Sequence, residues 1–186
     1  MGILEDGMGT GKKAKVSDDN RLNVSAKTES RIYYESRENE TAFSVYGKRN
    51  FAAADTEENI LYVKYTGNND LHIKSILFST NSELAKIEAF FAATSVSGGE
   101  EIIPLNMNRG SANESETECL HGGSTLNGTL DDANEFFDLR LSKSSFLMDF
   151  NSALIIPKNK NIFFKGDVAA IDDRIRIMIY FFESIE

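Results

Sequence analysis

The sequence predicts an all-β protein folded as an antiparallel β-sandwich. From residue 21 onward, apolar and polar residues alternate in short runs, which is the period of a strand with one buried face. Glycine and asparagine separate these runs, whereas proline occurs only twice. The chain has 186 residues, of which 41% are hydrophobic and 26% are charged, and this size and composition are typical of one globular domain.

The first 20 residues are predicted to form an extended N-terminal arm, followed by a single sandwich domain at 21–186. The arm contains four glycines and few large apolar side chains, so it cannot form a core of its own. Such a segment can become ordered on the surface of a neighbouring subunit. The arm residues that we expect in this contact are Ile3, Leu4, Met8, Lys12, Lys13 and Lys15.

The first four strands are predicted at 22–28, 41–47, 59–66 and 71–79. The first two are short runs in which apolar residues alternate with polar ones. The third and the fourth flank the sequence Gly67-Asn68-Asn69-Asp70, which is a strong turn signal. We therefore predict that these two strands form a hairpin.

The next segment, residues 82–91, fits either a helix capped by Ser82 or a strand, because its apolar residues also alternate with polar ones. Since the neighbouring segments are all strands, we predict a strand at 84–94. A Gly-Gly turn then leads to a predicted strand at 100–105.

Residues 106–132 are rich in asparagine, serine, glycine and glutamate, and they are predicted to form a long polar loop. A loop of this length in a compact domain usually has a functional or interface role. We expect Asn106, Asn108 and Arg109 at the start of the loop to contact another subunit.

Four strands are predicted after the loop, at 135–142, 153–156, 161–165 and 174–182. The last is apolar on both faces, which is typical of a central strand, or of a strand with one face against another subunit. One core is predicted to contain Leu61, Val63, Ile73, Ile76, Phe78, Ile155, Phe163, Ile175, Ile177 and Ile179.

No catalytic residue, cofactor or metal site is predicted. Residues 7–12 are glycine-rich like a phosphate-binding loop, but they lack its first glycine and the Ser or Thr that follows its lysine. Cys119 and His121 are too few ligands for zinc, and no third group is evident to orient them for nucleophilic catalysis. Asp131-Asp132 could offer oxygens to Ca²⁺ in the loop, although the spacing of an EF-hand is absent.

The formal net charge of −9 and the isoelectric point near 4.8 argue against a nucleic-acid partner. The longest apolar runs are far too short to span a membrane, so no membrane partner is expected. Residues 1–15 contain no apolar segment of the kind found in secretory signals, so we expect a protein that is not secreted.

Three stretches of the sequence carry a family resemblance. Residues 11–16 lead into the alternating segment 20–30, residues 103–111 open the polar loop, and residues 153–159 precede the final strands. This order resembles small virion structural proteins of tailed bacteriophages over most of the chain, although Lys158-Asn159 stands where a Pro-Gly turn is typical. The resemblance implies a jelly-roll-like sandwich and a component of the phage particle, and it implies no catalytic site.

From this resemblance we expect a non-enzymatic virion protein that is made in the host cytoplasm. The leading expectation is an auxiliary, cement-like decoration protein of the capsid, which forms a homo-oligomer and binds the major capsid protein. The alternative is a neck, tail or baseplate component that binds other neck or tail subunits. A second alternative is a carbohydrate- or receptor-binding sandwich, but the loop at 106–132 contains no aromatic residue for such binding.

Overall fold

The computed structural model describes residues 3–5, 13–15, 34–122 and 125–184. The chain divides into two units, Met1–Ser30 and Arg31–Glu186. In the first unit, β1 (Ile3–Glu5) and β2 (Lys13–Lys15) pair in antiparallel orientation. The strand predicted at 22–28 lies outside the described residues and stays a prediction.

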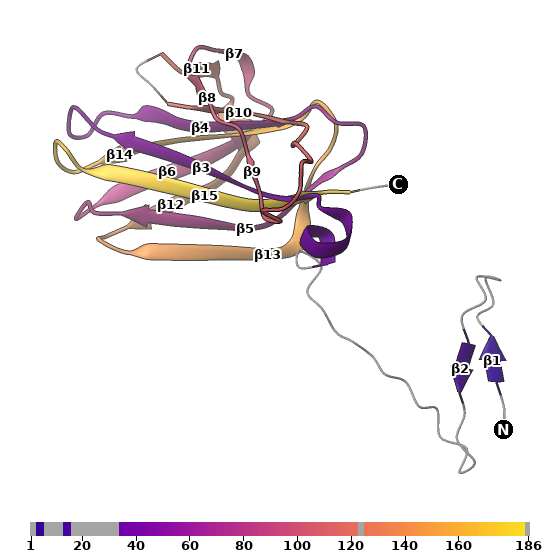
Figure 1. Cartoon of the computed structure of the whole chain (residues 1–186). Coiled ribbons are helices and arrows are strands. Elements are labelled where there is room, and N and C mark those ends of the chain that lie inside the picture. Colours follow the sequence, from indigo (N-terminus) through magenta and orange to yellow (C-terminus); the bar gives the residue numbers. More distant parts are fainter. Residues whose placement is uncertain (1–2, 6–12, 16–33, 123–124, 185–186) are drawn as a thin grey trace. The chain divides into compact units, whose positions relative to one another are not determined.

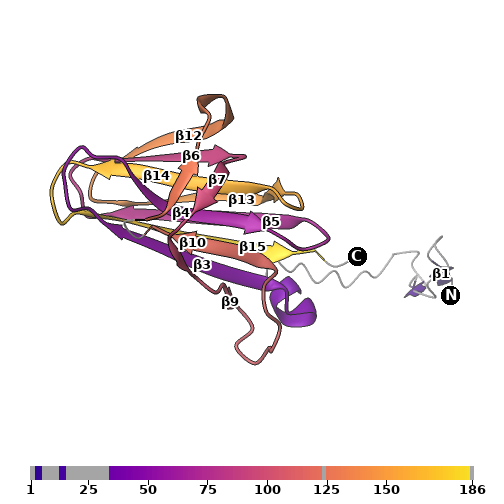
Figure 2. The ribbon, with the colours of Figure 1, turned by 90° about the horizontal axis from the view of Figure 1, so that it is seen from above.

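The second unit contains two large antiparallel sheets (Figure 1; turned by 90° in Figure 2). The strands of the first sheet are β4 (Glu58–Tyr65), β6 (Ala85–Phe91), β8 (Glu100–Glu101), β10 (Thr117–His121), β12 (Glu135–Leu141) and β14 (Asn161–Val168). They are arranged in the order β12-β6-β14-β4-β10-β8. The strands of the second sheet are β3 (Ala42–Asn50), β5 (Leu71–Thr80), β9 (Leu105–Asn106), β13 (Ser145–Ile156) and β15 (Arg174–Glu183). Their order is β13-β5-β15-β3-β9, so the predicted antiparallel β-sandwich is confirmed. The predicted hairpin of the strands at 59–66 and 71–79 is wrong, because the turn at 67–70 leads from β4 in one sheet to β5 in the other.

Smaller elements complete the second unit. Strands β7 (Thr94–Ser97) and β11 (Asn127–Thr129) form a two-stranded sheet of their own. A π-helical turn, η1 (Glu35–Asn39), precedes β3, and a 3₁₀ turn, η2 (Asp132–Asn134), precedes β12. Within the described ranges, no helix has the length and the apolar character needed to cross a membrane.

The main core lies between the two large sheets. Ile175, Ile177 and Ile179 of β15 are fully buried there, as expected for the middle strand of a sheet. Phe78 of β5 and Phe164 of β14 meet across the core with ring centroids 6.2 Å apart. Eight predicted core residues are confirmed in this cluster, namely Leu61, Val63, Ile73, Ile76, Phe78, Ile175, Ile177 and Ile179.

Two predicted core residues are placed wrongly. Ile155 is 44% exposed, because it lies on the outer face of β13 together with Leu147, whereas Met148, Leu154 and Ile156 face the core. Phe163 is buried, but it lies on the other face of its sheet, in a second cluster with Tyr62, Ala93 and Leu126.

Two predicted strands are interrupted. Residues 84–94 form strand rather than helix, as predicted. The strand is broken at Ala92, whose positive φ of 55° separates β6 from β7. The predicted strand 100–105 divides into β8 and β9, which join different sheets. Pro104 lies between them and has no N–H to donate to a continuous ladder.

The segment at 106–132 is more regular than the predicted polar loop. It contains β10, in which Thr117 and Cys119 are buried while Glu118 between them is exposed. β10 pairs with β4 along all of its five residues. The strand predicted at 153–156 is also only the last part of β13, which begins at Ser145.

Candidate functional site: the open edge of the five-stranded sheet

The nine residues predicted to form an interface are distributed over both units, and two of them lie outside the described residues. Ile3 and Leu4 lie in β1 and Lys13 and Lys15 in β2, whereas Met8 and Lys12 lie outside the described residues. Asn106, Asn108 and Arg109 belong to the second unit.

The two predicted asparagines hold the chain in place locally. Asn106 Nδ2 donates to the carbonyl oxygen of Glu40 at 2.8 Å, and Asn108 Nδ2 donates to Glu40 Oε1 at 3.3 Å. Asn108 Oδ1 also accepts from the N–H of Gly110 at 3.1 Å. These bonds tie the end of β9 and the residues after it to the end of η1, and of the three predicted residues Arg109 is the one that is exposed to solvent.

The edges of the two large sheets differ in how well they are protected. An edge strand presents unpaired N–H and C=O groups, and proteins limit this hazard with short edges, charges or bulges. β8 and β9 have two residues each. β12 carries exposed charges at Asp138 and Arg140. β13 has 12 residues, and its far side has no strand partner in the described part of the chain.

β13 has two halves of different character. In the second half, Asn151 and Ser152 have positive φ angles of 49° and 67°, and the pairing with β5 shifts register there. In the first half, residues 145–149 pair regularly with β5 and contain neither lysine nor proline. Phe146 is 41% exposed and Leu147 is 54% exposed. The first half of β13 is therefore a regular, apolar and unprotected edge, and Figure 1 shows β13 at the lower border of the sandwich.

An apolar row crosses the outer face of the five-stranded sheet and ends at this edge. Met178 of β15 lies opposite Tyr46 of β3 on one side and Leu77 of β5 on the other. Leu77 in turn lies opposite Leu147 of β13. Since Ile177 and Ile179 face the core, Met178 and its cross-strand neighbours face outward. The four residues form a continuous stripe in which Tyr46 and Leu147 are exposed and Met178 and Leu77 are half-buried, and we call this stripe the apolar row.

Aromatic rings fill the core behind the edge. Phe136 of β12 lies 6.0 Å from Phe150 of β13 and 4.8 Å from Phe91 of β6, measured between ring centroids. Phe137 contacts both Phe136 and Phe78, at 5.4 and 5.5 Å. This packing joins the two edge strands β12 and β13 across the sandwich.

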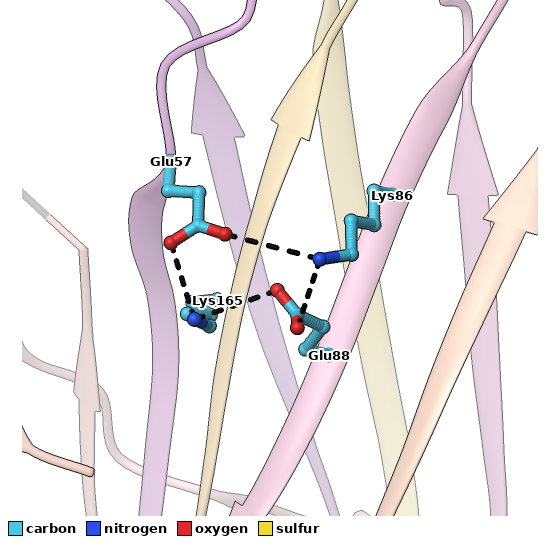
Figure 3. A network of polar contacts seen from close by, with 4 residues as sticks. All are labelled: Glu57, Lys86, Glu88 and Lys165. Atoms are coloured by element: carbon cyan, nitrogen blue, oxygen red, sulfur yellow. Dashed lines mark hydrogen bonds and ion pairs between the residues drawn. The ribbon is translucent and has the colours of Figure 1, made fainter. Parts of the chain in front are cut away.

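A network of four charges lies on the six-stranded sheet (Figure 3). Lys86 Nζ lies 2.9 Å from Glu88 Oε1, and Lys165 Nζ lies 3.1 Å from Glu57 Oε2. Each lysine also approaches the other carboxylate, at 3.9 and 3.5 Å. Burial disfavours the charge of Glu88, but its hydrogen bond with Lys86 and the charge of Lys165 outweigh burial and lower the pKa of Glu88. The four charges balance one another, so the network holds neighbouring strands together.

The remaining candidate residues have structural positions. Cys119 is buried in the core, and burial raises the pKa of its thiol, which stays protonated and inert. His121 Nε2 lies 2.9 Å from Glu100 Oε2 on the neighbouring strand. Asp131 Oδ1 accepts from the N–H of Ala133 at 3.0 Å and so caps η2. No cluster of three His, Cys, Asp or Glu side chains suited to a metal occurs among the described residues.

The chain matched no protein-family model, no curated protein and no solved structure. The geometry of the open edge is therefore the main guide to function, and the sequence could not have located it. The alternation in residues 145–149 is visible in the sequence, but only the strand order shows that this segment lies at an edge.

Proposed function

We propose that this chain is a non-enzymatic structural protein of a bacteriophage virion, acting as an auxiliary capsid protein that self-associates. The resemblance of the sequence to small phage virion proteins supports the particle assignment. The observation that carries the proposal of self-association is the unprotected first half of β13. A protein that works by assembly needs a surface that a second subunit can cover, and this edge supplies one.

The occupant that best fits this edge is a second copy of the same chain. In a two-fold antiparallel pair centred on Leu147, that residue lies opposite itself, and Phe146 lies opposite Met148 of the other copy. Such pairing satisfies the free backbone groups of both edges and joins two five-stranded sheets into one. It also brings the apolar rows of the two copies end to end.

The local charge at the edge favours association of identical chains. The chain carries a net charge of −9, so two copies repel each other at most surfaces. The one charged residue in the first half of β13 is Asp149, and Lys74 Nζ lies 2.6 Å from its Oδ1. The hydrogen bond from Lys74 also lowers the pKa of Asp149, so the carboxylate stays ionised and paired. This neutral apolar stretch is where two acidic bodies can approach.

Sedimentation velocity of the full chain tests the self-association. The wild type is expected to sediment as a concentration-dependent oligomer, and Leu147→Lys is expected to sediment as a smaller species, since a lysine at the edge blocks strand pairing. Ile103→Lys is the matched control, because Ile103 is 71% exposed and lies outside β13. An oligomer that survives Leu147→Lys, or a wild type that is monomeric throughout, would contradict the proposal.

Quantitative mass spectrometry of purified particles tests the virion assignment separately. A decoration protein is expected at a copy number close to that of the major capsid protein. A copy number close to that of a neck or tail ring would favour the alternative location. Absence from purified particles would refute the virion assignment while leaving the self-association result intact.

A further inference from the structure

A basic cleft lies at one end of the five-stranded sheet, where the end of β5, the start of β13 and the start of β15 meet. Its volume is about 330 Å³. The lining contains three cationic side chains, from Lys143, Arg174 and Arg176, and no carboxylate. Serine hydroxyls from Ser79, Ser144 and Ser145 also line it. We call this the basic cleft.

The two arginines of the basic cleft lack anionic partners. Among the described residues, no carboxylate forms an ion pair with Arg174 or Arg176. Arg176 Nε is buried and has no hydrogen-bond partner in the described part of the chain. A buried donor without a partner costs free energy, so this is a site where an acceptor from a ligand would be stabilising. Lys143 pairs with Glu83 at the exposed rim.

The strand register brings more donors to the same place. Arg176 lies opposite Ser79 on β5 and opposite Lys48 on β3, and Ser79 lies opposite Ser145 on β13. These four residues form one cross-strand row on the outer face, next to the apolar row. The hydroxyls of Ser79 and Ser145 make no hydrogen bond to another described residue.

Backbone bonds hold the walls of the basic cleft in place. The N–H of Arg174 donates to Asn81 Oδ1 at 2.7 Å, and Thr80 Oγ1 donates to the carbonyl oxygen of Arg174 at 2.9 Å. The N–H of Thr80 donates to the carbonyl oxygen of Ser144 at 3.0 Å. The three segments that carry the donors are therefore tied together without any ligand.

We propose that the basic cleft binds a tetrahedral oxyanion, the phosphate or sulfate group of a small ligand. Guanidinium groups offer forked donors that match oxyanions, and hydroxyls add neutral donors around them. Two arginines, a lysine and three serines offer more donors than the two oxygens of a carboxylate accept, so a tetrahedral group fits better. Ser145 belongs to the first half of β13, but the two arginines lie on β15 in the middle of the sheet, so the test at Arg176 is separate from the test of self-association.

Isothermal titration calorimetry of the full chain tests the proposal, with inorganic phosphate, inorganic sulfate and glycerol phosphate as probes. Ionic strength is held constant with sodium chloride, because exposed charges are screened by salt. The wild type is expected to bind at least one probe saturably. Arg176→Gln is expected to weaken that binding about tenfold or more, as for a lost charge-assisted hydrogen bond. The probe bound most tightly distinguishes a free anion from an ester.

Two further variants make the result decisive. Arg109→Gln removes an exposed arginine outside the cleft and is expected to leave binding unchanged. Circular dichroism shows whether Arg176→Gln is still folded. Lys143→Gln changes an exposed turn, so it tests the basic cleft without disturbing the core, and it is expected to weaken binding. The proposal is overturned if the wild type binds no probe saturably, or if the arginine and lysine variants of the cleft bind as tightly as Arg109→Gln.

Discussion

Ile177 and Ile155 are both isoleucines in strands of the same sheet, yet Ile177 is fully buried and Ile155 is 44% exposed. Ile177→Ala should therefore lower the free energy of unfolding by about 2–5 kcal/mol, because it leaves a cavity in the core. Ile155→Ala should lower it by less than about 1 kcal/mol. Urea unfolding followed by circular dichroism measures both, and equal losses would show that the register of β13 is wrong.

The lowered pKa of Glu88 predicts how the stability of the protein depends on pH. Because its pKa is lower in the folded protein than in the unfolded chain, ionised Glu88 contributes stability above the unfolded pKa. This contribution is lost as the pH falls through the folded pKa, so the wild type should lose stability on acidification. Glu88→Gln cannot ionise, so its free energy of unfolding should fall less between neutral and acidic pH. Identical pH profiles for the two proteins would refute the ionic role of the network in Figure 3.

Residue burial is predictable from the sequence where alternation is regular. Ile175, Ile177 and Ile179 alternate without interruption, so their common face follows directly. The face of Ile155 does not follow from the sequence, because residues 153–156 are apolar at every position and do not show which parity faces the core. Phe163 was misplaced because both faces of β14 are apolar, and only the small β7–β11 sheet explains why the outer face is covered.

At the level of elements, close packing of strands constrains Gly166 of β14. A Cβ atom at this position would lie 2.5 Å from the carbonyl oxygen of Lys86 on the neighbouring β6. Gly166→Ala should therefore destabilise the fold by about 1–3 kcal/mol, since backbone must move to relieve the overlap. Gly110→Ala is the control, because the nearest atom to its Cβ would be 3.5 Å away. Thermal unfolding measures the difference, and equal melting temperatures would contradict the close approach.

The strands themselves were largely predictable, and their partners were not. Long alternating segments such as 174–182 identify a strand from local pattern alone. β10 was missed because its buried positions include a threonine and its neighbours are polar. The candidate site was missed for another reason: the exposed edge depends on which strands pair, and pairing is set by contacts between residues distant in sequence.

On the scale of the whole molecule, the net charge opposes self-association, whereas the unprotected edge of β13 favours it. The acidic surface keeps separate copies apart, while one neutral apolar edge remains open for pairing. Among the described residues of the two large sheets, β8 and β9 are too short and β12 too charged to accept a further strand. The first half of β13 is therefore the edge at which a second copy can pair. Self-association through this route should therefore produce one defined dimer contact.

A disulfide test measures this contact most directly. In a two-fold antiparallel pair centred on Leu147, the two Cα atoms at this position would be about 4.5–5.5 Å apart, within the range of a disulfide. The native Cys119 is buried and does not compete. Leu147→Cys is therefore expected to form a covalent dimer on mild oxidation, seen on a non-reducing gel, whereas Ile103→Cys remains monomeric. A Leu147→Cys variant that stays monomeric, or that crosslinks no better than Ile103→Cys, would contradict pairing through β13.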